Sequence, residues 1–135
     1  MDYRKANLKQ EYLKQSVMTA SPADLIVMLF DACIKNLKLA VINLEDNHDF
    51  SSAHTHFINA QEIIMELISC LDPNVDLSSK LLDIYDFLLR TIREMNIKKD
   101  LSPLPDVLEI LSSMRDTWQQ ISKTSYGLTQ EVNVG

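Results

Sequence analysis

The sequence predicts an all-α protein, an antiparallel up-and-down four-helix bundle over residues 19–122, with a short N-terminal flap (1–18) and a disordered C-terminal tail (123–135). Glycine, which tight β-hairpins need at positive φ, occurs only at Gly127 and Gly135. Apolar residues recur at helical spacing in four segments of about twenty residues. The breaks between them are short, and short connections force neighbouring helices to run antiparallel. A chain of 135 residues is expected to form one domain.

The first helix is predicted from Pro22 to about Glu45. Ser21 can accept a hydrogen bond from a free backbone N–H of the first turn, and Pro22 fits the first helical position. Asp24 complements the positive end of the helix dipole. The apolar positions spaced three and four apart predict a core seam of Ile26, Leu29, Cys33, Leu37, Ala40 and Leu44.

The second helix is predicted from a cap at Ser51 or Ser52 to about Leu71, where the Asp72-Pro73-Asn74 break follows. Its seam is Phe57, Ala60, Ile64, Leu67 and Leu71. The third helix is predicted to begin after an Asp76 cap and to end at Lys98-Lys99-Asp100, where the cations suit the helix dipole. Its seam is predicted to be Leu77, Leu81, Ile84, Leu88 and Met95.

The fourth helix is predicted to begin after Ser102, with Pro103 and Pro105 both tolerated in its first turn. Its seam is predicted to be Leu104, Val107, Leu111, Met114, Trp118 and Ile121. From Ser122 onward no helical period is present, so the tail is predicted to be disordered. Within the polar first 18 residues, Tyr12 and Leu13 could lie on the bundle surface as a loose flap.

Composition excludes several classes of function. Scarce glycine excludes phosphate-cradling loops. A net charge of −6, with scattered basic residues, argues against nucleic acid as a partner. The polar N-terminus resembles no Sec signal, and the longest uncharged apolar run, Leu25 to Phe30, is too short for membrane insertion. A cytosolic protein is therefore predicted, with Cys33 and Cys70 as small, buried side chains that stay reduced.

Signals for an enzyme are weak. Glu45 and His48 have the E-x-x-H spacing of carboxylate-bridged metal sites, with His54 and His56 nearby. Such sites need a second copy of that motif and further inward-facing glutamates, which this sequence does not supply. No nucleophile stands in an activating arrangement. We predict no catalytic residue, no metal and no cofactor, and keep a metal or redox enzyme as a remote alternative.

The remaining signal is surplus apolar surface. Each predicted helix carries apolar residues beside its core seam, among them Ala32 and Leu39 on the first helix and Leu82 on the third. Inner positions of a small bundle can absorb some of these residues. Together they exceed one core seam, and they predict grooves that receive an amphipathic partner helix. A structural bundle that forms a homodimer through this surface is the alternative.

The local motifs resemble those of the flagellar secretion chaperone FliS family over about residues 12–121. No single piece is decisive, but their order and spacing are specific. The matching pieces are VMTASPADL (17–25), Met28-Leu29-Phe30-Asp31, AQEII (60–64), Glu66-Leu67, Leu71-Asp72, Tyr85-Asp86-Phe87, Arg90, Asn96, Asp100 and Arg115-Asp116-Thr117-Trp118. The departures are Phe30 and Phe87 for tyrosine, Ala32 for glycine and Thr91 for arginine, which remove polar groups and keep the apolar shape.

The resemblance implies a cytosolic export chaperone that binds the disordered C-terminal segment of flagellin along apolar grooves. Such a chaperone prevents premature polymerisation and aids type III export. The resemblance also implies that the N-terminal flap, here with Tyr12 and Leu13, covers part of this surface until the client arrives. Other flagellar export or regulatory proteins remain open as partners. The residues expected to line the groove are Leu25, Met28, Ile63, Tyr85, Leu89 and Ile92.

Overall fold

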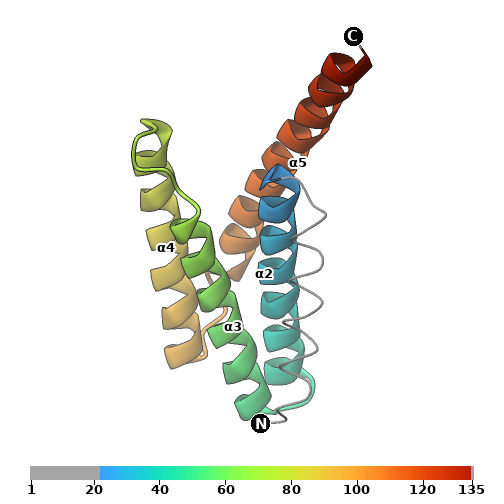
Figure 1. Cartoon of the computed structure of the whole chain (residues 1–135). Helices are drawn as coiled ribbons and strands as arrows, with labels where there is room; N and C mark the ends of the chain where they lie inside the picture. The colour runs from blue at the N-terminus through green and yellow to red at the C-terminus, as the bar shows by residue number, and fades with distance from the viewer. Residues whose placement is uncertain (1–21, 135) are drawn as a thin grey trace, which may run out of the picture.

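The structure, a computed structural model, describes residues 22–134 and the side chains up to Thr124. It contains four helices, α2 (Pro22–Glu45), α3 (Phe50–Ser69), α4 (Leu77–Lys98) and α5 (Leu104–Val134), which run alternately up and down (Figure 1). The all-α prediction and the antiparallel order are therefore confirmed. The predicted flap with Tyr12 and Leu13, and the predicted cap Ser21, lie outside the described residues.

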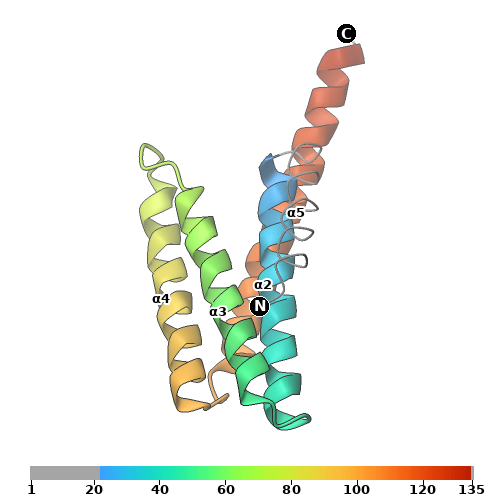
Figure 2. The same cartoon turned by 60° about the horizontal axis from the view of Figure 1, so that its bottom comes forward.

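The helices pack in the spatial order α4–α3–α2–α5, so that α2 and α3 are central and α4 and α5 lie at the two margins. Contacts between α4 and α5 are few compared with those of the other neighbouring pairs. We call the end with the α2–α3 and α4–α5 connections the closed end, and the opposite end the open end. Toward the open end, the α3–α4 hairpin diverges from the α2–α5 pair (Figures 1 and 2).

The core lies among all four helices and follows the predicted seam closely on α3. On α2 it includes the middle of the predicted seam, and Val27 and Phe30 are buried in place of Ile26 and Leu29, which are partly buried. Cys33, Leu37 and Ala40 of α2 are completely buried against the predicted apolar face of α3. The buried residues of α3 are Ala53, Phe57, Ala60, Ile64 and Leu67. Central helices are covered on both sides, so their apolar stripes coincide with their buried faces.

The predicted seam of α4 is wrong at two positions. Leu77 is 57% exposed and Ile84 is 38% exposed, whereas Tyr85 and Ile92 are 1% and 0% exposed. Tyr85 reaches inward to Phe30 of α2, with the ring centroids 6.3 Å apart. The physical reason is that α4 packs mainly against α3, which turns its buried face toward that neighbour.

Two differences concern α5. Ile121, predicted as a core residue, is 42% exposed, while Val107 and Leu111 are buried as predicted. The helix also continues to Val134, past the predicted boundary at Ser122, and its last part projects beyond the other helices (Figure 1). No proline interrupts residues 122–134, so nothing in the chain forces the helix to end sooner.

The helix ends are set by side chains beside the predicted caps. Asp49, rather than Ser51 or Ser52, caps α3: its carboxylate accepts bonds from Ser52 N (3.1 Å) and Ser52 Oγ (2.7 Å), which lower the pKa of Asp49. Asp76 occupies the predicted N-cap of α4 but makes no side-chain capping bond. Ser102, predicted to cap the last helix, instead donates to Asp100 in the connection before α5.

The two cysteines have opposite environments. Cys33 is buried, with Sγ 3.8 Å from the carbonyl oxygen of Ala60, and burial raises the pKa of its thiol to about 12. Cys70 is exposed, so the prediction that it is buried is wrong; it lies at the C-cap of α3, where the helix ends.

We therefore expect Ellman's reagent to modify the Cys70 thiol quickly in the native protein and both thiols after denaturation, since the thiolate is the reactive form. Because the pKa of folded Cys33 lies above its ordinary value of 9.0, its contribution to stability is present below pH 9 and is lost as the pH rises toward 12. Fast modification of both thiols in the native protein would show that the α2–α3 seam opens readily.

Candidate partner-binding surface

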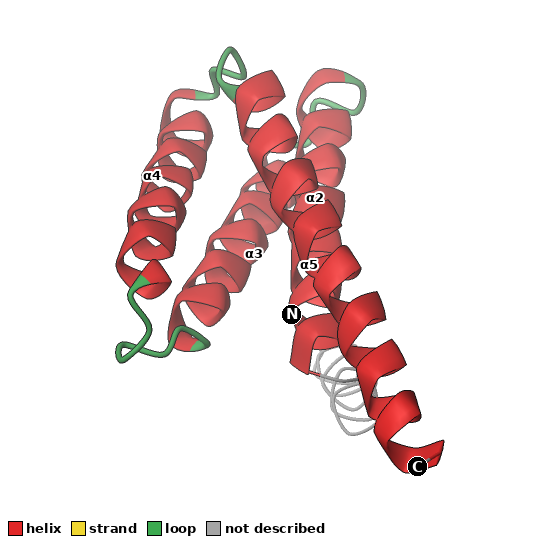
Figure 3. Cartoon of the chain, turned by 90° about the horizontal axis from the view of Figure 1, so that it is seen from above, coloured by secondary structure: helices red, strands yellow, loops and turns green. Residues whose placement is uncertain are grey.

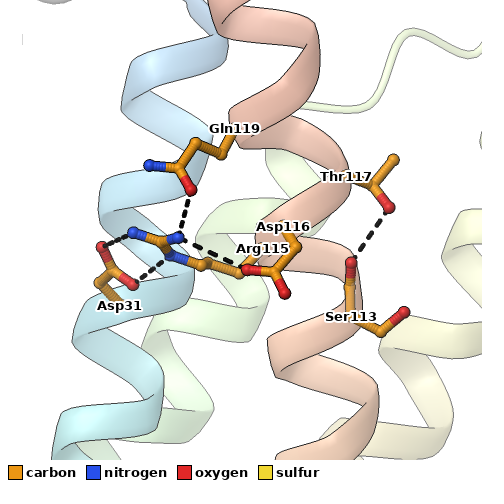
Figure 4. Close-up of polar contacts among 6 residues, drawn as sticks. All are labelled: Asp31, Ser113, Arg115, Asp116, Thr117 and Gln119. Carbon is orange, nitrogen blue, oxygen red and sulfur yellow. Dashed lines mark hydrogen bonds and ion pairs between the residues drawn. The ribbon is translucent and has the colours of Figure 1, made fainter.

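Polar bonds orient α5 on α2. The Arg115 guanidinium donates to both carboxylate oxygens of Asp31, at 2.8 and 3.4 Å, and to Gln119 Oε1 at 2.5 Å (Figure 4). The bond to Asp31 raises the pKa of Arg115, which keeps the guanidinium charged. Nearer the open end, Ser122 Oγ donates to the Asp24 carboxylate. These contacts place one flank of α5 against α2.

A second group of polar bonds orients α4 on α3. Asn96 Nδ2 lies 3.0 Å from His54 Nδ1, and Lys99 Nζ donates to Asn96 Oδ1 at 2.6 Å. Lys99 has a left-handed backbone (φ 53°) and lies over the Phe57 ring, 5.6 Å from its centroid. The flank of α4 that carries Asn96 therefore faces α3.

A third group joins α2 to α3. Asn36 Oδ1 lies 3.0 Å from His56 Nδ1 and accepts from Asn59 Nδ2 at 3.4 Å. Together, the three groups of bonds set the register of all four antiparallel helices. When residues are counted along each helix from these bonds, Ile84 of α4 lies at about the same height along the bundle axis as Trp118 of α5. Leu81 lies at about the same height as Ile121.

Beside its most deeply buried residues, each of α4 and α5 carries a stripe of partly buried or exposed apolar side chains, and we call the surface formed by these two stripes the open side. Its members are Leu81, Ile84 and Phe87 of α4 and Met114, Trp118 and Ile121 of α5, spaced three or four residues apart on each helix. Ile84, Phe87 and Ile121 are 38%, 45% and 42% exposed, and the other three are partly buried against the core. Seen from above, α4 lies beside α3, and α5 crosses in front of α2 (Figure 3).

A shallow hollow of about 420 Å³ adds to this surface on α5, where it is lined by Thr117, Gln120, Ile121 and Thr124. These four residues share one face of the helix by their spacing. The hollow is therefore adjacent to the apolar flank and extends it toward the open end.

The structure separates the six residues predicted to line a groove. Leu25 and Met28 of α2 and Ile63 of α3 are partly exposed on neighbouring helices, and Leu89 is partly exposed on α4. Tyr85 and Ile92 are core residues, so their predicted place at the surface is wrong. Burial also raises the pKa of Tyr85 to about 12, together with the nearby Cys70. Periodicity identifies apolar positions on α4 but not which of two neighbouring stripes faces inward.

Residues missed by sequence reasoning lie mainly on the open side. Ile84 and Ile121 were assigned to the core and are exposed, and Phe87 was noted only as part of a motif, whereas Leu81, Met114 and Trp118 pack against the core as predicted. The sequence feature that could have identified this surface was the wide apolar face of α4. That face is wider than its one close neighbour, α3, can bury.

The described residues offer no cluster of three His, Cys, Asp or Glu side chains that could hold a metal ion. Glu45 and His48 are both exposed at the closed end, and His48 is in a loop with φ 50°. Within the same part of the chain, none of the helices is long and apolar enough to cross a membrane.

Comparisons with known proteins cover most of the chain, including most of the four-helix bundle. The family model described as flagellar protein FliS covers residues 5–125. The flagellar secretion chaperone FliS of Bacillus subtilis is 37% identical over 109 residues, which are 81% of this chain and 81% of the relative. The chaperone of the same name from Vibrio cholerae is 30% identical over 126 residues (89% and 92%), and that from Salmonella typhimurium 29% over 115 residues (84% and 85%). On this coverage and identity, the chain belongs to the FliS family of flagellar proteins.

Proposed function

We propose that this protein is a flagellar export chaperone that binds the disordered C-terminal segment of flagellin on its apolar surface. It would hold the segment in the cytosol, prevent premature polymerisation and release the client to the type III export machinery. Family membership supports the role, since the relatives above are named flagellar secretion chaperones. The observation that carries the mechanism is the open side.

The open side has the chemistry that an amphipathic helix requires. Its apolar side chains lie on two helix flanks at matching heights, so a helix lying along them could insert residues spaced i, i+3, i+4 and i+7. No charged side chain is among the six residues that define it. A disordered client segment could therefore fold on this surface by burying its own apolar face.

The energetics call for a surface of this length. Ordering about twenty client residues costs on the order of 20–40 kcal/mol of backbone entropy. At roughly 25 cal/mol per Å², burial alone would have to remove about 800–1,600 Å² of apolar surface from water to offset that cost. Stripes along several helices supply far more area than one pocket, which is why we add Leu25, Met28, Ile63 and Leu89 to the proposed client-binding residues.

The direct test is calorimetric titration with a peptide that spans the C-terminal segment of flagellin from the same organism. We expect one-to-one binding with a negative heat-capacity change and a gain of helical circular dichroism, since apolar burial and coupled folding give these signatures. Absence of binding at high micromolar peptide would contradict the proposal. Concentration-dependent mass without the client would then favour the homodimer.

The N-terminal segment supplies a second prediction, based on the proposed flap with Tyr12 and Leu13. Deleting residues 1–17 is expected to tighten client binding, because the client no longer has to displace the flap. The same deletion should lower the solubility of the free protein by exposing apolar surface. Calorimetry and light scattering measure the two effects. Equal or weaker affinity of the truncated protein would contradict the flap.

A further inference from the structure

The bonds between helices are unevenly placed along the bundle. Those that connect the α3–α4 hairpin to α2 lie between the middle of the bundle and the closed end. Asn36 meets His56 and Asn59, and Cys33 Sγ lies against the Ala60 carbonyl oxygen. In the half nearer the open end, the hydrogen bonds between helices that involve described side chains join α2 to α5.

Near the closed end, polar contacts also hold α4 against α3. Asn96 links His54 of α3 to Lys99 at the end of α4, and the Lys99 ammonium group also lies over the Phe57 ring. This set fixes the spacing of α3 and α4 where α4 leads into α5. Hydrogen bonds are directional, so they resist sliding at this end.

The open end is held differently. Here α2 and α5 are joined by the Asp24–Ser122 bond and the Asp31–Arg115 pair, and the α3–α4 hairpin meets α2 through apolar side chains such as Tyr85, whose ring centroid lies 6.3 Å from that of Phe30. Apolar attraction is non-directional, and small sliding of packed helices against one another is a recurring form of conformational change in proteins. The two ends therefore differ in stiffness.

We infer that the α3–α4 hairpin is hinged at the closed end and swings at the open end, which changes the width of the open side for the partner helix. The inference rests on the proposed function for its occupant, an amphipathic helix of the client. Ile84 and Phe87 would move with the hairpin, whereas Trp118 and Ile121 stay with α2. Client affinity then depends on the fraction of molecules in which the open side is wide enough.

Distances between spin labels test the hinge. One pair, Asp83→Cys with Lys123→Cys, spans the open end, and a matched pair, Glu45→Cys with Glu94→Cys, lies in the closed-end half. All four residues are exposed and belong to neither the open side nor the bonds above. Cys70→Ser removes the exposed thiol, and buried Cys33 stays unlabelled because its thiol pKa is raised to about 12.

In the free protein, the hinge predicts a broader distance distribution for the open-end pair than for the closed-end pair. Adding the flagellin peptide should shift the open-end mean by about 2 Å or more and narrow it, with the closed-end distance unchanged. Equal widths in the free protein, or peptide binding without a shift, would overturn the hinge. Calorimetry on the labelled protein separates the two proposals: failure to bind contradicts the proposed function, while the widths in the free protein still decide the hinge.

Discussion

Replacing Ile84 by aspartate is expected to weaken binding of the flagellin peptide by roughly 30-fold or more, the effect of losing about 2 kcal/mol at a central interface residue. Ile84 lies in the middle of the α4 flank of the open side, where a client helix would bury it. A buried, unpaired carboxylate is costly, so the substitution acts against the complex. Titration calorimetry measures the loss.

The bundle itself should tolerate Ile84→Asp, because the side chain is 38% exposed and the new charge can remain in water. Ser79→Asp is the matched control: it places the same charge on an exposed position of α4, away from the open side. We expect this control to bind the peptide as the unmodified protein does. Equal affinity of the Ile84 and Ser79 variants would show that the client does not use this flank.

Replacing Ile92 by alanine is expected to lower the free energy of unfolding by about 2–5 kcal/mol, as for other large-to-small changes in a closely packed core. Ile92 is 0% exposed and belongs to the cluster that contains Tyr85, Leu88 and Met95. Urea denaturation followed by circular dichroism gives the change. Where the variant remains folded, its affinity for the flagellin peptide should be nearly unchanged.

Ile97→Ala provides the control for this second substitution. It removes the same atoms from the same helix at a position that is 72% exposed, so the stability should change by about 0.5 kcal/mol or less. If Ile92→Ala kept full stability and lost the client, Ile92 would be a surface residue of the binding site, as the sequence analysis expected. The pair of variants therefore separates core from surface on α4.

Sequence reasoning succeeded best on the central helices. The predicted bounds of α2 agree with the structure, and most of the predicted core of α2 and α3 is buried. It also identified the family, whose motifs are local runs such as VMTASPADL. These features depend on contacts between residues close in the chain, or on stripes that have neighbours on both sides.

The predictions were less accurate for α4 and α5, the helices at the two margins of the bundle. On α4, Ile84 and Tyr85 are adjacent in the chain and both apolar, so either could belong to the core. Packing against the other helices, including the contact of the Tyr85 ring with Phe30 of α2, turns Tyr85 inward and leaves Ile84 at the surface. The same reasoning applies to Ile121 of α5, whose opposite flank is held against α2 by Arg115 and Ser122.

The sequence therefore specified what propensity and periodicity control: an all-α chain, four helices, their approximate ends and their order. The packing of the helices specified which apolar residues are available to a partner. That outcome follows from the spatial order α4–α3–α2–α5, in which the two marginal helices barely meet. A helix with one close neighbour buries one stripe and exposes the next, and no pattern within a single helix states where its neighbours will lie.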